Sequence, residues 1–370
     1  EGLKPLLANF ERMPLEARLP EELPNWESVD EQNLEEHVLS GKSILICGMP
    51  GTGKTYIARR LIGKLRESGK LVETVSKTHV STQNLGCGAK TADHFVRKHI
   101  RHGSTGADVL VVEELTQIDV YLWCDIGKLL HKGTQFILLG DFRQFSAICA
   151  SWSCAPLPDD ALKKSDLLYK LAGGFHAELT VNRRSDPKIF NFIKSLCIDE
   201  PREVRKDEAV AEARRLYPTT GARADFTLVM SHRRRLMVNS ILNLEDRMGR
   251  DDAVEIRIET AKQVDNNAPQ SMWIWPGLRL IGAGRKVPKG LLRTVKACDG
   301  DMVTLDTDLE LSHLQVSQSL RLCYAITYAS CQGLTLSGRV RLETESRFLT
   351  TRHLYVGISR ATSSDLVEVS

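Results

Sequence analysis

The chain lacks a long apolar run: nowhere in its 370 residues does a stretch approach the roughly 20 apolar residues that a transmembrane helix needs. The first 24 residues, EGLKPLLANFERMPLEARLPEELP, also lack the apolar core of a secretory signal. We therefore expect an intracellular protein with no membrane partner. The sequence begins at Glu1 rather than Met, which is compatible with a fragment of a longer protein.

Closely paired cysteines are lacking as well. The nine cysteines are odd in number and scattered, with no C-x-x-C pair and no histidine at zinc-finger spacing. This pattern predicts reduced, mostly buried thiols rather than a disulfide framework. A partial metal site of Cys149, Cys154 and His176 is the less favoured alternative.

A strong excess of one charge is also absent. Fifty lysines and arginines face 47 aspartates and glutamates, which gives a formal net charge of +3. This balance is too even to indicate a nucleic-acid partner by itself, so local features must carry that argument. The length and the hydrophobic share of 42% predict a globular protein of about two or three domains.

The sharpest feature that is present is a phosphate loop. Residues 48–55 read GMPGTGKT and satisfy the pattern G-x-x-x-x-G-K-[ST] at every fixed position. Glycines let backbone N–H groups surround phosphates, the lysine reaches the β- and γ-phosphates of ATP, and the final hydroxyl binds Mg²⁺. The residues expected to bind the nucleotide here are Gly48, Pro50, Gly51, Thr52, Gly53, Lys54 and Thr55.

The sequence on either side of the loop supports this interpretation over a chance glycine-rich turn. Ser43–Cys47 is an apolar run typical of a buried strand. Tyr56–Ser68 carries apolar residues at helical spacing until Gly69. The predicted order of strand, loop and helix is the context in which this motif binds phosphate.

Two further predicted strands end in polar residues suited to ATP hydrolysis. Asp108–Val112 leads into Glu113 and Glu114, of which one acid can hold Mg²⁺ and the other can polarise the attacking water. Gln135–Leu139 leads into GDFRQ, where Gln144 is placed as a γ-phosphate sensor would be. The carboxyl edge of a parallel sheet is where α/β proteins bind their ligands.

Two loops between these strands are rich in small hydroxyl residues. The first contains Thr78 and His79, and the second contains His94 and Phe95. Such a surface can hydrogen-bond phosphates and stack a base, although ordinary loop and capping roles explain the same residues. The basic run Arg97–His102 that follows is typical of a solvated helix face.

The pattern changes in the second half of the chain. Residues 156–178 read as a connector, and Asp225–Met230 reads as a buried strand followed by three arginines. Between Trp273 and Leu305, short apolar runs are separated by Pro-Gly and Asp-Gly pairs, which predicts a small β unit with a hairpin.

Six motifs, in order and spacing, resemble those of superfamily 1 helicases. They read GMPGTGKT, VLVVEE, FILLGDFRQF, LTVNRRSD, YAITYASCQGLT and LYVGISRAT. The chain is most similar to the 5′-to-3′ branch that includes RecD, phage Dda and the Pif-family enzymes, from about Ser43 to Ser370. The resemblance implies an α/β fold with two RecA-like P-loop domains, each a parallel sheet flanked by helices, and a small SH3-like β insert in the second domain.

The domain limits that we expect from this resemblance are an N-terminal helical segment at 1–40, a first RecA-like domain at 41–155 and a second at 156–370. The β insert is expected at about 271–320.

The resemblance also implies roles for single residues. The implied catalytic residues are Lys54, Glu114, Gln144, Arg184 and Arg360, of which the two arginines reach the γ-phosphate from the second domain. Thr55 and Glu113 are the implied magnesium ligands, and Gln332 and Gly333 belong to the nucleotide site. The implied contacts to single-stranded DNA are Thr78, His79, His94, Phe95 and Thr327.

Two places depart from the family pattern. Glu113 stands where the family usually has Asp, and motif V reads TYASCQG from Thr327 to Gly333 where the family commonly reads T-x-H-K-S-Q-G. The missing His and Lys bear on strand contact and on its coupling to hydrolysis, and not on the fold.

The resemblance implies an ATP-dependent DNA helicase that uses ATP and Mg²⁺, moves 5′-to-3′ on single-stranded DNA and unwinds tailed duplexes. It further implies a monomer on DNA that works with replication or repair proteins. Two alternatives stay open: an RNA helicase of the viral replicase type, and a nucleic-acid-binding scaffold whose ATPase has decayed. The compact insert favours DNA over RNA, and the intact catalytic residues argue against decay.

Overall fold

The computed structural model describes residues 25–103, 105–147, 151–152, 155–258 and 270–370. The chain divides into two compact units, one up to Arg184 and one from Ser185 onward, with Thr78–Val80 grouped with the second. Among the described residues, no helix is long and apolar enough to cross a membrane.

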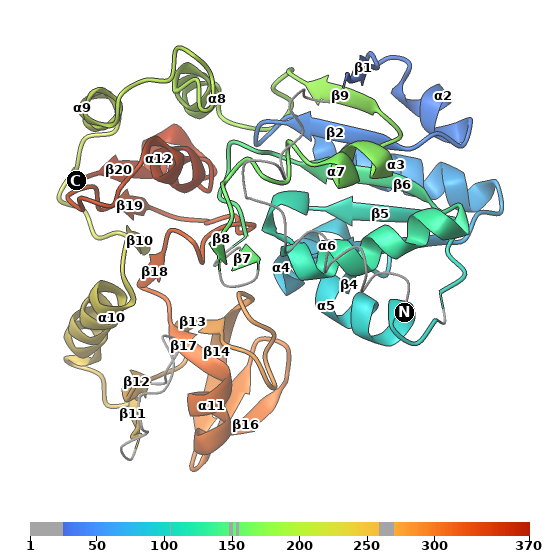
Figure 1. Cartoon of the computed structure of the whole chain (residues 1–370). Coiled ribbons are helices and arrows are strands. Elements are labelled where there is room, and N and C mark those ends of the chain that lie inside the picture. Colours follow the sequence, from blue (N-terminus) through green and yellow to red (C-terminus); the bar gives the residue numbers. More distant parts are fainter. Residues whose placement is uncertain (1–24, 104, 148–150, 153–154, 259–269) are drawn as a thin grey trace. The chain divides into compact units, whose positions relative to one another are not determined.

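The first unit is built on a seven-stranded parallel sheet in the order β1-β9-β2-β6-β5-β3-β4 (Figure 1). Its strands are β1 (Glu27–Ser28), β2 (Ile44–Gly48), β3 (Val72–Ser76), β4 (Lys90–Thr91), β5 (Val109–Glu113), β6 (Gln135–Gly140) and β9 (Phe175–Leu179). Because every pairing is parallel, the carboxyl ends of all these strands lie at one edge of the sheet.

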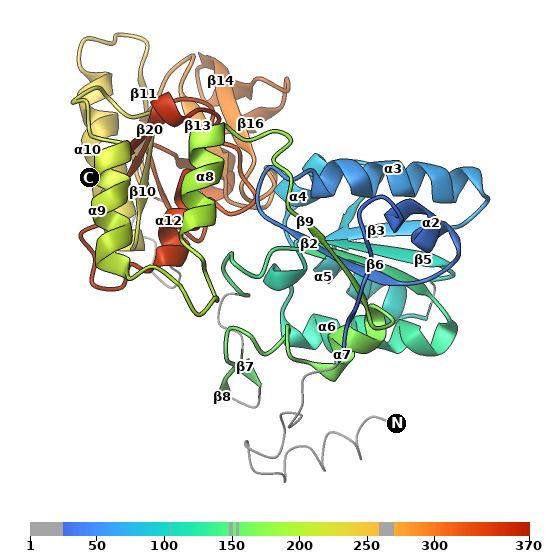
Figure 2. The same ribbon diagram turned by 90° about the horizontal axis from the view of Figure 1, so that it is seen from above.

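Alternate residues of the central strands are buried on opposite faces of this sheet. Ile44 and Ile46 of β2 belong to one apolar core, and Leu45 between them belongs to the other. The first core is covered by α2 (Leu34–Leu39) and α3 (Lys54–Glu67), and the second by α5 (Ala92–Phe95), α6 (Val120–Gly127) and α7 (Asp166–Leu171), as Figure 2 shows. Burial on both faces explains why these strands read as continuous apolar runs.

Shorter segments complete the first unit. They are α4 (His79–Leu85), whose first two residues are grouped with the second unit, the π-helical η2 (Val96–Ile100), the 3₁₀ segments η3 (Leu115–Gln117) and η4 (Lys128–Lys132), and the antiparallel pair β7 (Ser151–Trp152) and β8 (Ala155–Pro156).

The division between the units differs from the expected one. We expected the second domain to begin at residue 156, but β9 pairs in parallel with β2 and with β1, so the chain as far as Arg184 belongs to the first unit. The same pairing brings β1 into the first sheet, and α2 packs in the same core as α3. The described residues 25–40 therefore contribute to the first unit rather than forming a separate segment.

The second unit contains a four-stranded parallel sheet in the order β18-β10-β19-β20. Its strands are β10 (Phe226–Val229), β18 (Ala325–Thr327), β19 (Val340–Leu342) and β20 (Val367–Val369). Its helices are α8 (Pro187–Ser195), α9 (Lys206–Leu216), α10 (His232–Arg247) and α12 (Thr351–Ile358), with the 3₁₀ segment η5 (Ser364–Leu366).

The predicted β unit is present as a five-stranded antiparallel sheet with its own apolar core, in the order β16-β15-β14-β13-β17. Its elements are β13 (Arg279–Gly282), β14 (Leu292–Asp299), β15 (Met302–Leu305), β16 (Glu310–Ser312), α11 (His313–Ser319) and β17 (Leu320–Leu322). The separate pair β11 (Val254–Ile256) and β12 (Met272–Ile274) precedes it. This sheet runs two residues beyond the expected limit, because β17 pairs with β13 before the chain enters β18.

Candidate active site

The phosphate loop joins β2 to α3, and its backbone requires glycine. Gly51 and Gly53 have φ angles of +88° and +92°, where other L residues are strained. A Cβ added to Gly48 would lie 2.7 Å from Thr52 Oγ1 and 2.9 Å from the carbonyl oxygen of Leu179. Thr52 is fully buried and its hydroxyl donates to a loop carbonyl at 2.8 Å, which holds the loop from inside.

Lys54 is the first residue of α3 and lies over the loop. Its Nζ donates to the carbonyl oxygens of Gly48 at 2.6 Å and Met49 at 3.1 Å. The N-cap residue Gly53 supplies no side chain to cap the 14-residue helix, so the first N–H groups of α3 are left for an anion. An ammonium group and a helix N-terminus thus meet at the loop, which is the arrangement that binds phosphate.

Thr55 and Glu113 come together across the sheet edge. The Thr55 hydroxyl donates to Glu113 Oε1 at 2.5 Å, while Glu113 Oε2 is buried and has no hydrogen-bond partner among the described residues. Burial raises the pKa of Glu113 to about 7. The hydrogen bond from Thr55 lowers this pKa, and the negative charge of the neighbouring Glu114 raises it. A buried carboxylate with a free oxygen beside a hydroxyl fits the hard oxygen ligands that Mg²⁺ prefers.

No group of three or more His, Cys, Asp or Glu in the described part of the chain is arranged to hold a metal by itself. Mg²⁺ at Thr55 and Glu113 would therefore share its remaining positions with phosphate and water, as is usual for this ion. Cys149 and Cys154 lie outside the described residues. The seven described cysteines are free thiols, but only Cys323 and Cys331 among them are buried, so the expectation of mostly buried thiols was wrong.

Glu114 has a backbone conformation that the sequence did not reveal. Its φ of +54° and ψ of +45° are left-handed, which is uncommon for a residue with a side chain and costs roughly 1 kcal/mol. The carboxylate accepts from Gln117 Nε2 at 3.3 Å. The chain turns at Glu114 directly after the last residue of β5, so the two adjacent acids do not simply alternate across the sheet as strand residues would.

Gln144 lies after β6, the strand next to β2. The register pairs Cys47 with Gly140, so the segments that follow these two residues emerge side by side at the sheet edge. Gln144 is 4% exposed, and its Nε2 donates to the buried Asp141 at 3.3 Å. The structure thus brings Gln144 to the same edge as the phosphate loop and the acid pair.

Arg183 and Arg184 are attached to the phosphate loop through their backbone. Their N–H groups both donate to the carbonyl oxygen of Gly51, at 2.9 and 3.1 Å, and the Arg183 side chain pairs with Glu31. The segment follows β9 directly, so Arg184 belongs to the first unit, whereas we expected it to act from the second domain. Its side chain is exposed.

Arg360 lies in the second unit, two residues after α12, and is 7% exposed. Its Nε donates to the carbonyl oxygen of Val356 at 3.1 Å and its Nη2 to Ser359 Oγ at 2.8 Å. The described residues give it no ion pair, so a structural salt bridge does not account for this buried guanidinium.

The motif V residues of the second unit are largely buried. Thr327, the last residue of β18, is 4% exposed, and its hydroxyl donates to Ser330 Oγ at 2.8 Å. Gln332 is 8% exposed, and Gly333 has a φ of +80°.

The predicted nucleic-acid contacts differ in how accessible they are. His79 and His94 are exposed and Thr78 is half-buried, but Phe95 is fully buried in the core under α5 and α6. The prediction that the Phe95 ring contacts DNA is wrong for this structure, because helix packing takes the ring away from the surface. Thr91 is the N-cap of the short helix α5, and its hydroxyl accepts from the His94 N–H at 3.3 Å.

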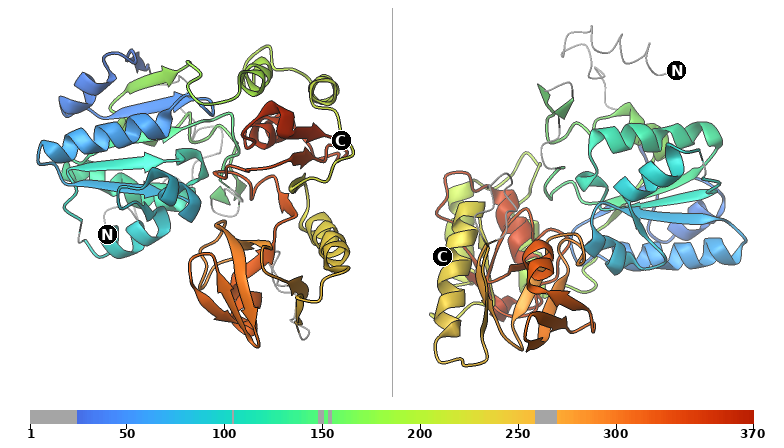
Figure 3. Two further views of the ribbon diagram at one scale, coloured as in Figure 1. Left: turned by 180° about the vertical axis from the view of Figure 1, so that it is seen from behind. Right: turned by 90° about the horizontal axis from the view of Figure 1, so that it is seen from below.

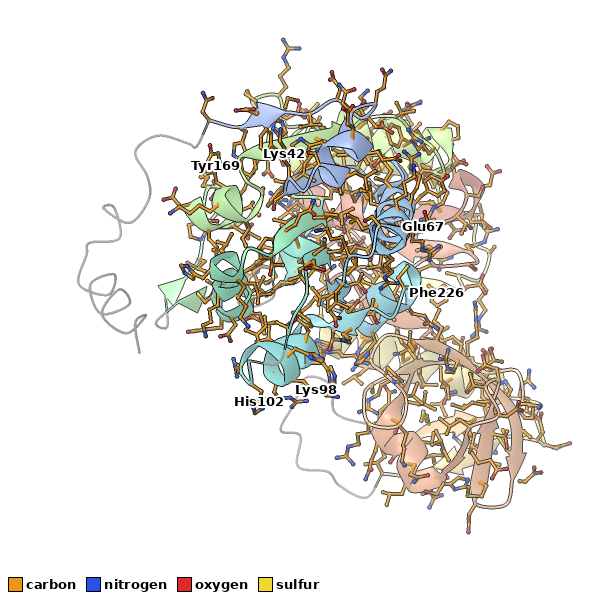
Figure 4. All side chains as sticks on the ribbon, turned by 90° about the vertical axis from the view of Figure 1, so that its right-hand side faces the viewer. Lys42, Glu67, Lys98, His102, Tyr169 and Phe226 are labelled. Atoms are coloured by element: carbon orange, nitrogen blue, oxygen red, sulfur yellow. The ribbon has the colours of Figure 1, made fainter. Side chains whose placement is uncertain are left out.

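Two further groups of basic residues are placed by the structure. Lys98 and His102 of the predicted basic run are exposed, as seen in Figure 4. Arg235 on α10 is 6% exposed, and its Nε and Nη2 have no hydrogen-bond partner among the described residues. Burial lowers the pKa of Arg235. The sequence showed three adjacent arginines but no signal for which of them is buried.

Comparison with known proteins agrees with this geometry. Residues 30–167 match the model of the family AAA_30, described as an AAA domain. The human ATP-dependent DNA helicase PIF1 is 26% identical over 133 residues, which cover 30% of this chain and 21% of that protein. The Trypanosoma brucei brucei ATP-dependent DNA helicase PIF3 is 29% identical over 140 residues, covering 33% of this chain and 17% of that protein. The matched region thus spans about a fifth of these relatives.

Solved structures extend the similarity to most of the chain. The Pif1 helicase from Candida albicans has a TM-score of 0.63 at 18% identity and covers 91% of this chain and 92% of its own. Bacteroides Pif1 bound to single-stranded DNA has a TM-score of 0.64 at 15% identity, with 91% and 90% covered. The chain has the Pif1 fold. The resemblance to the Pif branch and the expectation of two RecA-like domains are therefore confirmed.

Proposed function

We propose that the chain is an ATP-dependent DNA helicase of the Pif1 type. The observation that carries the proposal is the hydrogen bond from Thr55 to Glu113, whose second carboxylate oxygen has no hydrogen-bond partner among the described residues. This contact lies at the same edge of the sheet as the phosphate loop, Glu114 and Gln144. The second unit, which has its own parallel sheet, carries motif V after β18 and motif VI at the end of α12. A phosphate loop alone occurs in many enzymes, whereas these parts together are typical of superfamily 1 helicases.

The chain's own residues divide the chemistry of hydrolysis. Lys54 and the N-terminus of α3 bind the β- and γ-phosphates, Glu114 accepts a proton from the attacking water, and Gln144, Arg184 and Arg360 act on the γ-phosphate. Thr55 and Glu113 would hold Mg²⁺, and the bound ion would supply positive charge beside the phosphates. Glu114 is the candidate base because its neighbour Glu113 is already engaged by Thr55.

We propose single-stranded DNA and duplexes with a 5′ single-stranded tail as substrates. Among proteins of the same fold, one structure is of Bacteroides Pif1 bound to single-stranded DNA and another concerns unwinding at forked double-stranded DNA by two coordinating Pif1 helicases. Binding mainly through phosphates and base stacking makes affinity sequence-tolerant and salt-sensitive.

The test measures the ATPase rate with single-stranded DNA, with single-stranded RNA and with neither, followed by strand separation on 5′- and 3′-tailed duplexes. We expect stimulation by DNA and unwinding only from the 5′ tail. Stimulation by RNA alone would replace the proposal with an RNA helicase, and nucleic-acid binding without ATP hydrolysis would replace it with a scaffold. Robust unwinding from a 3′ tail alone would contradict the polarity.

A further inference from the structure

Helix α10 turns polar side chains toward its own unit and apolar side chains away from it. Arg235, Asn239 and Asn243 on its inner side are 6%, 0% and 2% exposed. On its outer side, Met237, Ile241, Leu244 and Met248 just past its end are 47%, 46%, 53% and 79% exposed. This is the reverse of the pattern that a surface helix of a globular protein normally shows. Within its unit, α10 lies at the edge in each view of Figures 1 and 3.

Hydrogen bonds prevent the helix from rotating its apolar side inward. Asn239 Oδ1 accepts from the Ala325 N–H at 2.7 Å, and its Nδ2 donates to the carbonyl oxygens of Leu322 and Ala325 at 3.2 and 3.1 Å. Asn243 Nδ2 donates to the carbonyl oxygen of Trp273 at 2.8 Å, and its Oδ1 accepts from the Trp273 N–H at 2.8 Å. Any rotation would leave these buried groups unsatisfied, at about 1–3 kcal/mol for each.

The four exposed residues form one continuous surface, which we call the α10 stripe. Their spacing of four, three and four residues places them within about 60° of one another around the helix axis and along roughly 16 Å of its length. Four large apolar side chains in this spacing match the way one helix receives the apolar face of another. An exposed apolar patch of this kind marks an interaction surface.

The charges beside the stripe indicate what covers it. Arg233 and Arg247 lie along one flank of the stripe. Among the described residues, neither arginine forms an ion pair, whereas Arg234 beside them pairs with Glu343. The Cζ atom of Arg247 lies 4.1 Å from the centre of the Trp273 ring. A second copy of α10 packed antiparallel would set Arg233 of one copy against Arg247 of the other, and like charges repel. A helix with acidic residues beside its apolar face has no such conflict.

We propose that the α10 stripe is a docking site for an amphipathic helix of another protein, with acidic residues facing Arg233 and Arg247. The site is separate from the residues assigned to ATP hydrolysis, so this proposal goes beyond the proposed function. It provides a means of attaching the protein to a partner through the outer surface of its second unit.

The test uses the full chain and a fluorescein-labelled helical peptide of about 18 residues with leucines at i, i+3, i+4 and i+7 and glutamates on both flanks. A matched peptide carries lysines in place of the glutamates. Fluorescence anisotropy is expected to show at least about tenfold tighter binding of the glutamate peptide. Ile241→Ser combined with Leu244→Ser is expected to weaken it at least about tenfold, whereas Leu314→Ser, which alters a 67% exposed leucine elsewhere in the unit, leaves it unchanged.

Charge reversal provides the second readout. Arg233→Glu combined with Arg247→Glu is expected to make the lysine peptide the tighter ligand, and ATP hydrolysis measured on each variant reports that the fold is intact. Equal affinity for both peptides overturns the proposal. The proposal is also overturned if the glutamate peptide binds the Ile241→Ser and Leu244→Ser variant as tightly as it binds the unsubstituted chain. Concentration-dependent dimerisation in sedimentation velocity that the serine variant abolishes also overturns it, because the occupant would then be a second copy.

Discussion

The hydroxyl of Thr55 donates to Glu113 Oε1 at 2.5 Å across 58 positions of sequence. This contact joins the helix after the phosphate loop to the strand that ends in the acid pair. Glu113 is thereby distinguished from Glu114, whose backbone is left-handed and whose carboxylate contacts Gln117 instead.

The two acids should respond differently to substitution. Glu113→Asp keeps a carboxylate near Thr55 and is expected to retain ATPase activity within about tenfold, or about 1.4 kcal/mol. Glu114→Gln is expected to bind ATP normally but to lose roughly 10²- to 10⁴-fold in turnover, because an amide cannot accept the proton. Steady-state ATPase assays beside fluorescent-nucleotide binding separate the two effects. If both variants were silent, the roles of these acids would be wrong.

Lys54→Ala is expected to abolish most ATP hydrolysis, because its ammonium, which contacts the Gly48 and Met49 carbonyls of the phosphate loop, is the group proposed to bind the phosphates. Lys70→Ala, which removes an exposed lysine beyond the end of α3, serves as the matched control and should leave turnover unchanged. Near-normal hydrolysis by folded Lys54→Ala would refute the phosphate-loop assignment.

Arg360→Ala is expected to slow hydrolysis on the order of 10³-fold while weakening ATP binding far less, because a guanidinium acts most strongly as charge develops on the γ-phosphate. Arg360→Lys should rescue poorly, since an ammonium cannot reproduce the planar fork of donors. Arg184→Ala tests the exposed arginine beside the loop in the same assay. Unchanged turnover in both alanine variants would remove these arginines from the mechanism.

Asn239→Ala is expected to destabilise the second unit by about 3 kcal/mol. The substitution leaves the Ala325 N–H and the Leu322 carbonyl without their bonds at a fully buried position, and each unsatisfied group costs about 1–3 kcal/mol. Ser240→Ala, at the adjacent exposed position, should change the free energy of unfolding by less than about 0.5 kcal/mol. Denaturant titration measures both, and similar values for the two variants would contradict the role given to Asn239.

His353 should make the stability of the second unit depend on pH. Burial lowers its pKa to about 4, and its Nδ1 accepts from the N–H of Thr350 at the start of α12. Because the folded pKa lies below the unfolded value of about 6.5, this contribution is present above pH 6.5 and is lost as the pH falls toward 4. The free energy of unfolding should fall by about 2 kcal/mol between pH 7 and pH 5 from this group.

His353→Gln provides the control for that prediction. Glutamine at this position can complete the same capping box with Thr350 but does not titrate. We expect similar stability at pH 7.5 and a flatter pH dependence than in the unsubstituted chain. An unchanged slope would mean that other groups cause the pH dependence.

Local sequence pattern was enough to specify several parts of this protein. Residues 48–55 specify the phosphate loop because only glycine tolerates the φ angles at Gly51 and Gly53, and the apolar runs around them specify strands because both faces of the first sheet are buried. The six motifs in order were enough to indicate the fold and the resemblance to Pif-type helicases.

Which distant residues meet, and which side chains are buried, depends on packing between segments and could not be predicted from local pattern. Because β9 pairs with β2, the first unit extends to Arg184 rather than ending near residue 155. Helix packing buries Phe95, although its sequence context suggested an exposed loop. Along α10, asparagines that bond the backbone of neighbouring strands turned the apolar residues outward. These outcomes depend on hydrogen bonds and packing between segments far apart in sequence. The periodicity of apolar residues within a single segment does not predict such contacts.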